Sequence, residues 1–335
     1  MTIEETQNPL VFVECMTFNH ANYIEDAMKG FVMQQTEFPY VVSVMDDAST
    51  DGEPEVIKRF LEKEFDMDSA ITHETDDRIR VVARHKTNEN CIFLVLYLKY
   101  NHYSIQKPKW KYFWNWRKNA KYIAMCEGDD YWTDPYKLQK QVDFLEEHED
   151  YSMCVNRTSW LLNNGSLCDD MSCCYENDQD LSTDEIIRYG GLYVNTVSTI
   201  YRNKSIKRDE FQWWKMADVG DYPLHIAASL RGKVRYFADD MSVYRYQCEG
   251  SWTSRTNQNY PHIKNEVAWL EELDEETNGK YVSGINFHLW RFYSALYKKR
   301  YVGFRPYWSS IRKSDEKKTV MYKRMIKDVI IRIIK

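Results

Sequence analysis

Three short acidic segments carry the residues whose types and spacing could do chemistry. The first, Glu127-Gly128-Asp129-Asp130, places three carboxylates within four residues. Such groups repel one another unless a cation or firm hydrogen bonds hold them. Mg²⁺ and Mn²⁺ prefer oxygen ligands, and Mg²⁺ is commonly held by one or two carboxylates together with phosphates. The segment therefore suits a clamp for a metal-bound diphosphate. The residues alone leave open a solvated turn that caps the next helix.

The other two segments are Asp46-Asp47-Ala48-Ser49-Thr50-Asp51-Gly52 and Gly220-Asp221-Tyr222-Pro223. In both, the polar side chains could simply cap the helix that follows. A carboxylate at Asp221 could instead act as a general base, provided that it lies within hydrogen-bond reach of a reacting hydroxyl.

Alternating strands and helices must position these segments. We expect strands over Leu10–Met16, Tyr40–Met45, Ile79–Ala83 and Tyr122–Cys126, and helices over Tyr23–Gln35, Glu55–Phe65 and Ile92–Tyr103. This order predicts the α/β class, with a mostly parallel sheet flanked by helices. Ligands of such sheets bind beyond the carboxyl ends of the strands. Two of the acidic segments directly follow predicted strands, at that edge.

The second half of the chain has a looser pattern. Asp134 is expected as the N-cap and Pro135 as the first residue of a helix. Strands are expected over Met153–Leu162, Tyr193–Tyr201, Val234–Phe237 and Met241–Gln247, a helix from about Tyr222, and only helices from about Asn259 onward.

Five segments in this order resemble glycosyltransferases of family 2, which have the GT-A type of nucleotide-sugar-binding fold. They are Thr17-Phe18-Asn19-His20, DDASTDG at 46–52, EGDDYWTDPYKLQKQVDFLE at 127–146, GDYPLH at 220–225 and MSVYRYQCEGSWT at 241–253. The resemblance covers roughly residues 8–255. It implies a GT-A catalytic domain over 8–255 and a helical C-terminal extension over 256–335.

The resemblance also implies a role for each matching residue. Thr17, Phe18 and Asn19 would line the pocket for the nucleotide base, and Asp47 would accept a hydrogen bond from the base or the ribose. Asp129 and Asp130 would bind the ribose and a Mn²⁺ or Mg²⁺ ion, with Asp130 as the direct ligand. Asp221 would be the catalytic base. Trp132 and Trp252 are candidates for sugar contacts, with packing in the core as the alternative.

A protein of this kind would transfer a sugar, with inversion, from a nucleotide-diphosphate donor to an acceptor hydroxyl. A UDP-sugar is the favoured donor, and a surface polysaccharide or lipid-linked glycan is the suggested acceptor. One alternative is a sugar-phosphate nucleotidyltransferase, which would be expected to carry a glycine-rich, Arg-containing loop where Thr17-Phe18-Asn19-His20 stands. A glycosidase would need two carboxylates but no metal–diphosphate clamp. A non-catalytic nucleotide- or carbohydrate-binding protein is the third alternative.

The chain departs from the family pattern at three places. Asn88-Glu89-Asn90 stands where Asn-Leu-Gly is frequent, and Gln247 stands where a His is common. The segment Lys107–Lys121 holds 6 basic and 5 aromatic residues in 15 positions. It could be a lid over an acceptor, a site for single-stranded nucleic acid or a lipid headgroup, or a loop docked on the body.

Charge is unevenly distributed along the 335 residues. The net charge of −6 argues against a nucleic-acid-binding protein. The segment from Lys298 to Lys335, however, contains 13 basic residues and only 3 acidic ones. An apolar stripe of Tyr322, Met325, Ile326, Val329, Ile330 and Ile333 predicts an amphipathic helix there. This helix would lie on an anionic membrane surface or dock on the body.

We expect a cytoplasmic protein, peripheral at the inner face of the cell membrane. No apolar run reaches the roughly 18–20 residues that span a bilayer. The start, MTIEETQNPL, lacks the basic and apolar parts of a signal peptide. The eight cysteines are then expected as reduced thiols. Cys168, Cys173 and Cys174 lack the spacing of a zinc site.

Overall fold

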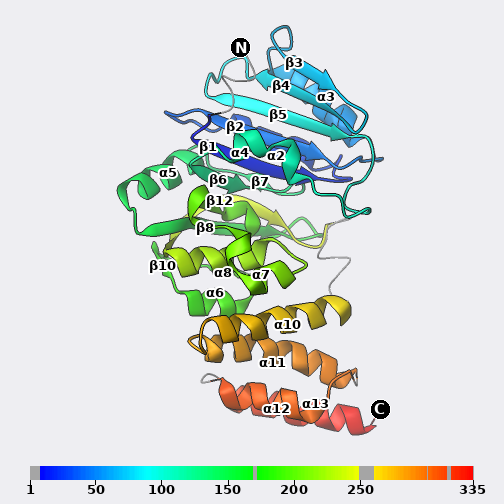
Figure 1. Ribbon diagram of the computed structural model, residues 1–335, viewed down its shortest axis with the longest axis vertical. Coiled ribbons are helices and arrows are strands. Elements are labelled where there is room, and N and C mark those ends of the chain that lie inside the picture. The colour runs from blue at the N-terminus through cyan, green and yellow to red at the C-terminus, as the bar shows by residue number, and fades with distance from the viewer. Residues whose placement is uncertain (1–7, 169–171, 249–259, 300, 315–317, 335) are drawn as a thin grey trace. The chain divides into compact units, whose positions relative to one another are not determined.

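The computed structural model of the chain describes residues 8–168, 172–248, 260–299, 301–314 and 318–334 (Figure 1). The chain forms two compact units that are not contiguous in sequence. The first comprises Met1–Asp180, Asn195–Ser205 and Gly232–Arg255, and the second comprises Leu181–Val194, Ile206–Arg231 and Thr256–Lys335. The second unit thus combines the C-terminal helices with two earlier segments.

The first unit is built on a twelve-stranded mixed sheet. Its centre has the order β6-β1-β2-β5, and each neighbouring pair is parallel. These strands are β1 (Val11–Thr17), β2 (Tyr40–Asp46), β5 (Cys91–Leu98) and β6 (Tyr122–Met125). The full order is β10-β12-β8-β11-β6-β1-β2-β5-β4-β3, with β7 paired to β12 and β9 paired to β8.

The remaining strands flank this parallel centre, and several of their pairings are antiparallel. They are β3 (Ile71–Glu74), β4 (Arg78–Arg84), β7 (Tyr131–Trp132), β8 (Tyr151–Leu161), β9 (Leu167–Cys168), β10 (Gln179–Leu181), β11 (Ile200–Arg202) and β12 (Lys233–Arg245). The predicted α/β class is confirmed.

The core forms because the central strands are apolar on both faces, so helices must cover them. Helices α2 (Ile24–Val32) and α3 (Glu53–Glu64) contribute apolar stripes to it, and α5 (Lys137–Glu147) adds another. Core residues from strands and helices include Val11, Val13, Val42, Val44, Phe93, Val95, Ile24, Met28, Phe31, Ile57, Phe60, Leu138 and Val142. The remaining short helical elements of this unit are η1 (Trp110–Tyr112), α4 (Trp114–Arg117), η2 (Thr196–Ser198) and η3 (Asn203–Ser205).

The parallel centre brings four turns to one edge of the sheet. Because β6, β1, β2 and β5 run in the same direction, the segments that follow them leave from the same side. These segments begin at residues 18, 47, 99 and 126. Two of the three acidic segments therefore share an edge, as the sequence predicts.

The helix predicted over Ile92–Tyr103 is wrong. Cys91–Leu98 forms β5, which pairs with β2 and β4 and is buried along nearly its whole length. The segment reads CIFLVLYL and has no polar face at helical spacing. A strand with neighbours on both sides is the element that buries such a run.

Three smaller differences concern element ends. The two strands predicted over Val234–Phe237 and Met241–Gln247 are one strand, β12, with irregular register on either side of Asp240. The strand predicted over Tyr193–Tyr201 is the 3₁₀ turn η2 followed by β11. Helix α5 begins at Lys137, and Asp134 Oδ1 accepts a hydrogen bond from Tyr136 N at 2.7 Å. Asp134 thus stabilises the turn before the helix instead of capping the helix itself.

The second unit is helical. Its elements are α6 (Thr183–Tyr189), η4 (Arg208–Glu210), α7 (Gln212–Met216), α8 (Asp221–Arg231), α10 (Tyr260–Glu276), α11 (Val282–Lys298), α12 (Phe304–Lys313) and α13 (Lys318–Ile334). Buried Trp213 and Trp269 pack at 5.8 Å between ring centroids and join α7 to α10. Among the described helices, none combines the length and the apolar character needed to cross a bilayer.

Candidate active site

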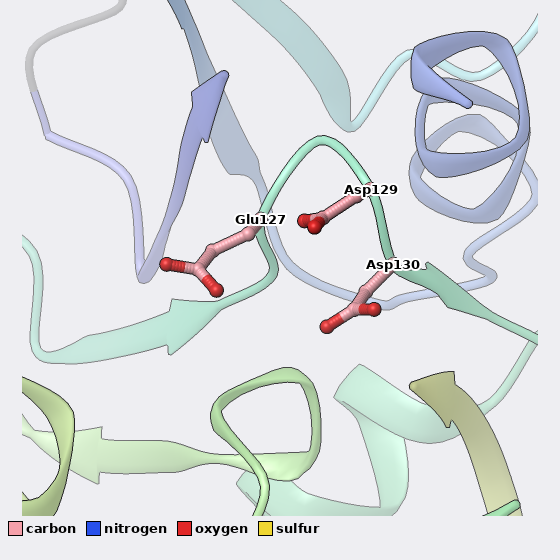
Figure 2. A group of neighbouring side chains, drawn as sticks. All are labelled: Glu127, Asp129 and Asp130. Atoms are coloured by element: carbon pink, nitrogen blue, oxygen red, sulfur yellow. The ribbon is translucent and has the colours of Figure 1, made fainter. Parts of the chain in front are cut away.

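The turn after β6 gathers three carboxylates (Figure 2). One oxygen from each of Glu127, Asp129 and Asp130 lies within 4.8 Å of the others. Glu127 is exposed, whereas Asp129 is 9% exposed and Asp130 only 1%. Three carboxylates at this separation repel one another, so the turn favours a positively charged partner.

Asp130 has one satisfied oxygen and one unsatisfied oxygen. Its Oδ1 accepts a hydrogen bond from Arg245 N at 2.8 Å. Its Oδ2 is buried without a hydrogen-bond partner among the residues that the structure describes. Burial raises the pKa of the Asp130 carboxyl well above its usual range, and the charge of Asp129 raises it further. A divalent cation would give Oδ2 a partner and offset the repulsion, so these residues fit Mg²⁺ or Mn²⁺.

Arg245, at the end of β12, holds the acidic turn in place. Its Nη1 donates to the carbonyl oxygen of Asp129 at 2.7 Å, and its Nη2 donates to Asp26 Oδ2 at 2.6 Å. The guanidinium also lies 5.0 Å from the ring centroid of Tyr23 and 4.6 Å from that of Tyr131. A single buried arginine thus ties the acidic turn to β12 and α2.

Asp129 is flanked by a nitrogen and a sulfur. His20 Nε2 lies 3.8 Å from Asp129 Oδ2, and the buried thiol of Cys248 donates to the same oxygen at 3.3 Å. On its other side, His20 Nδ1 lies 3.1 Å from Thr17 Oγ1. These contacts connect the acidic turn to the turn that follows β1.

Gly128 allows the two turns to approach closely. A Cβ atom at this position would lie 2.1 Å from Thr17 Oγ1 and 2.6 Å from Thr17 Cβ. Gly128 N also donates to Met16 O at 3.0 Å. Any side chain at residue 128 would therefore push the acidic turn away from β1.

Glu53, the first residue of α3, joins the turns after β1 and β2. It is fully buried, and its carboxylate accepts hydrogen bonds from Thr17 Oγ1, from His20 N at 2.9 Å and from Ser49 Oγ at 2.7 Å. Three donors satisfy this buried charge. The resulting network fixes the positions of the turns after β1 and β2 relative to each other.

Asn19 adds a second connection between the same turns. Its backbone φ is 59°, in the left-handed region that Asn tolerates better than most residues. Asn19 N donates to Ser49 Oγ at 2.8 Å, and Asn19 Oδ1 accepts from Thr50 N at 2.9 Å. Half-buried Phe18 lies in this turn beside Thr17, whose carbonyl accepts from Asp47 N at 3.0 Å. The structure therefore brings Thr17, Phe18, Asn19 and Asp47 together.

Asp47 is already engaged by the segment after β5. Its carboxylate is 2% exposed and accepts from His102 N at 2.7 Å, Tyr103 N at 3.1 Å and Lys109 Nζ at 3.0 Å. Groups of this chain thus make the hydrogen bonds that the sequence assigned to a base or ribose. The nucleotide-binding role of Asp47 stays a prediction.

The basic–aromatic segment Lys107–Lys121 is docked on the first unit along part of its length. Tyr112 OH donates to Asp77 Oδ2 at 2.7 Å, and Phe113 and Trp116 are buried. Trp110 and Trp114, in contrast, are 56% and 44% exposed and pack edge-to-face at 5.6 Å between centroids. The docked-loop alternative describes this segment in part, and two tryptophans stay open to solvent.

Asp221 belongs to the second unit and opens α8. Its Oδ1 accepts a hydrogen bond from Tyr222 N at 2.8 Å. His225, one turn further on, is buried, and this burial lowers its pKa to about 4 against the opposing effect of Asp221. The imidazole is therefore neutral at physiological pH. The catalytic role of Asp221 stays a prediction.

The two tryptophans considered for sugar contacts have different outcomes. Trp132 is 2% exposed, donates from Nε1 to Val197 O at 2.9 Å and packs edge-to-face against Phe31. It is a core residue, as the packing alternative holds. Trp252 lies outside the described residues.

Sequence reasoning assigned no role to four residues that build this site: His20, Glu53, Arg245 and Cys248. His20, Arg245 and Cys248 stand inside the quoted motifs, so their position was a signal. Glu53 follows Thr50 by three residues, which is the spacing of a capping box. The capping-box pattern explains Glu53 locally. The contacts of Glu53 with the turn after β1 form only when the chain folds, so the sequence did not predict them.

Comparisons with known proteins support the predicted resemblance. No family model matches the chain. The uncharacterized protein Rv1520 of Mycobacterium tuberculosis (strain ATCC 25618 / H37Rv) is 27% identical over 239 residues, which are 71% of this chain and 59% of that protein. The chain therefore spans less than two thirds of the length of this relative.

A Bacillus subtilis (strain 168) protein carries the name "Putative teichuronic acid biosynthesis glycosyltransferase TuaG". It is 25% identical over 139 residues, which are 42% of this chain and 43% of that protein. The S. aureus TarS 1-349 structure in complex with UDP-GlcNAc is 14% identical, covers 96% of this chain and 89% of its own, and has a TM-score of 0.56. The resemblance to glycosyltransferases is confirmed by these neighbours, and TarS shows the same fold.

Proposed function

We propose that the chain is a metal-dependent, inverting glycosyltransferase that uses a nucleotide-diphosphate sugar, with a UDP-sugar as the favoured donor. The observation that carries the proposal is the unsatisfied, buried Oδ2 of Asp130 in a turn of three carboxylates. This turn lies at the edge of the parallel strands where such folds bind ligands. The fold shared with TarS, whose structure contains UDP-GlcNAc, supports the same donor class.

Asp130 and Asp129 would hold the Mn²⁺ or Mg²⁺ ion. When bound, the ion supplies Lewis-acid stabilisation of the charge on a departing diphosphate. Arg245 N donates to the Asp130 carboxylate, and the Arg245 guanidinium donates to the backbone carbonyl oxygen of Asp129, so the turn that carries both carboxylates is preorganised. Preorganised groups need little rearrangement during the reaction, which lowers the free energy of the transition state.

Thr17, Phe18 and Asn19 would form the base pocket, with Phe18 as the stacking surface. Asp47 would bind the base or ribose. Its three present hydrogen bonds come from residues 102, 103 and 109. A nucleoside that binds Asp47 must therefore share or replace one of them, and donor binding would then rearrange this segment.

Asp221 would be the general base. It would accept the proton of the acceptor hydroxyl while that oxygen forms a bond to the anomeric carbon. The bond from the anomeric carbon to the diphosphate oxygen breaks in the same displacement, and the configuration inverts.

Replacing Asp221 by Asn should lower transfer by roughly 10²–10⁴-fold, the usual contribution of a general base. Donor affinity, measured by calorimetry with a non-hydrolysable donor, should be unchanged, and near-normal turnover would remove Asp221 from the mechanism.

The acceptor would be a hydroxyl of a surface polysaccharide or lipid-linked glycan, used at the inner face of the cell membrane. The name of TuaG places that protein in teichuronic acid biosynthesis, and we take this as support for a glycan acceptor.

A panel of nucleotide sugars tests the proposal by the release of free nucleotide with Mn²⁺, Mg²⁺ or chelator. We expect release from one donor class, loss of release with chelator, and a decrease of about 100-fold or more for Asp130→Asn. The matched control is Asp68→Asn, at an exposed aspartate in the same unit. Full activity with chelator would exclude the metal. Pyrophosphate release from a nucleoside triphosphate and a sugar phosphate would favour a nucleotidyltransferase, and donor binding without turnover would favour a binding protein.

A further inference from the structure

The helices α12 and α13 carry a continuous apolar strip on their exposed side. The strip consists of Phe304, Trp308, Tyr322, Ile326 and Ile330. Phe304, Trp308, Ile326 and Ile330 are 44%, 36%, 56% and 50% exposed. The ring centroids of Phe304 and Trp308 are 5.9 Å apart, and those of Trp308 and Tyr322 are 5.4 Å apart. Tyr322, Ile326 and Ile330 follow at intervals of four residues on one face of α13.

A buried carboxylate fixes which face of α13 points inward. Asp328 is 3% exposed and accepts from Ser294 Oγ at 2.6 Å and Tyr307 OH at 2.8 Å. Met321 and Met325 are buried on the same side of the helix. Rotating α13 to bury the apolar strip would expose these methionines and leave Ser294 and Tyr307 without their acceptor. The strip is therefore held outward by the fold.

The sequence left two alternatives for this helix, a membrane surface or the body of the protein. In the structure, part of the predicted stripe is buried and part is exposed. Met325 packs inward, whereas Ile326 and Ile330 face outward. One helix thus has a docked face and a separate exposed apolar face.

The surroundings of the apolar strip are strongly basic. Helices α12 and α13 contain eight Lys and Arg residues and one acidic residue, Asp328, which is buried. The exposed basic residues are Arg305, Arg312, Lys313, Lys318, Lys323, Arg324 and Lys327. Lys323 and Lys327 each follow a strip residue by one position, so their charges border the strip. Their aliphatic stems let the ammonium groups reach phosphates while the strip is immersed.

We propose that the apolar strip and its basic border bind the headgroup region of an anionic phospholipid bilayer, with α13 lying in the interface. Aromatic and aliphatic side chains on one face with lysines beside them are the combination that such an interface stabilises. Each basic residue near an anionic surface adds attraction that salt screens. The surface lies in the second unit and needs no donor, so the proposal is independent of the catalytic one.

Vesicle flotation with the full chain tests the proposal. The vesicles contain either phosphatidylcholine alone or phosphatidylcholine with about 30% phosphatidylglycerol, a strongly anionic surface. We expect about tenfold or more stronger partitioning to the anionic vesicles, and weaker partitioning as NaCl is raised.

Two double variants separate the apolar and basic contributions. Ile326→Ser with Ile330→Ser removes two apolar anchors, and Lys323→Glu with Lys327→Glu reverses two bordering charges. Each should lower partitioning about tenfold or more. The matched control is Leu192→Ser with Met216→Ser, two apolar residues of the same unit that are 44% and 42% exposed. It should partition like the wild type. Circular dichroism and elution volume show whether each variant is folded.

Absence of partitioning by the wild type, or equal partitioning by wild type and both folded double variants, would overturn the proposal. A stable dimer that the isoleucine variant dissociates, without vesicle binding, would also overturn it and assign the strip to self-association. Nucleotide release in vesicle-free buffer is expected to be the same in all these variants. A failed membrane assay is thereby distinguished from a failed catalytic proposal.

Discussion

Asp46 is a buried carboxyl whose ionisation carries a cost in the folded protein. It ends β2, is 1% exposed and accepts a hydrogen bond from Ser49 N at 3.0 Å. Burial raises its pKa from 3.8 to about 6, although Ser49 acts in the opposite direction. The folded state therefore binds a proton that the unfolded state has lost between about pH 4 and pH 6. Asp46 makes the protein less stable as the pH rises through this range.

Replacing Asp46 by Asn should remove this cost and keep an acceptor for Ser49 N. The free energy of unfolding of the variant should equal that of the wild type near pH 4. Above pH 6 the free energy of unfolding of the variant should exceed that of the wild type by up to about 3 kcal/mol. Urea unfolding at several pH values measures the difference. A constant difference across pH 4–7 would contradict the raised pKa.

Gly128 should tolerate no side chain. In Gly128→Ala the new Cβ would meet Thr17 Oγ1 and Cβ at 2.1 and 2.6 Å, so either the acidic turn or β1 must shift. We expect a loss of about 1–3 kcal/mol in the free energy of unfolding, typical of overpacking, together with weaker Mn²⁺ binding. Denaturant unfolding and Mn²⁺ titration by electron paramagnetic resonance measure the two effects. Gly220→Ala is the matched control, because its Cβ would meet no atom within 4 Å. Wild-type behaviour of Gly128→Ala would show that the close approach is unimportant.

The sequence pointed to the acidic turn but not to the residues that hold it in place. Asp129 and Asp130 were recognised because three carboxylates in four residues are conspicuous. The connection of Glu53 to Thr17 and His20 was not predictable, because it joins residues more than thirty positions apart. Such contacts depend on the register between β1 and β2, which no local pattern contains.

The segment after β5 owes its position to one buried carboxylate at the end of another strand. Asp47 accepts from the backbone N–H groups of residues 102 and 103 and from Lys109. In Asp47→Ala these donors lose their acceptor, and the loss of buried hydrogen bonds costs about 1–3 kcal/mol. We expect the amides of residues 102 and 103 to exchange hydrogen roughly 10–100-fold faster, because exchange follows the free energy of local opening.

Hydrogen exchange followed by mass spectrometry measures this effect on peptides that cover residues 99–112. The control variant is Asp66→Ala, which removes an exposed carboxylate bonded to Ser69 within its own turn. Unchanged exchange in Asp47→Ala would mean that other contacts, such as that of Tyr112 with Asp77, hold the segment.

Elements with a local signature were predicted, and elements decided by their neighbours were not. The strands β1, β2, β4 and β6 follow turn-bounded apolar runs, and α2 and α3 follow helical apolar spacing. Strand β5 was predicted as a helix, because a run of eight apolar residues suits either a buried strand or a buried helix. Its pairing with β2 and β4 decides the matter. For α13 the sequence predicted a helix but not which of its faces is buried, and Asp328 selects that face through contacts with Ser294 and Tyr307.

Across the whole chain, charge separates the surface proposed to bind a metal ion from the surface proposed to bind a membrane. The acidic turn lies in the first unit, and the basic helices α12 and α13 lie in the second. Composition showed this asymmetry, since the last 38 residues are basic and the rest of the chain is acidic. Composition could not show that the second unit also includes Asp221, because that assignment depends on helices packing across long stretches of sequence.

Thiol reactivity tests the packing of the whole chain at eight positions. All eight cysteines are free, with six buried, Cys168 partly exposed and Cys174 exposed. Burial raises the pKa of Cys91 to about 12 and that of Cys15 well above its usual range, so few buried thiolates exist near neutral pH. Because the thiolate is the reactive form, a pulse of N-ethylmaleimide should label Cys174 first and Cys168 next. The six buried thiols should react only when denaturant opens the fold. Peptide mass spectrometry measures labelling at each position, and rapid labelling of Cys15 in the native protein would contradict the packing of β1 described above.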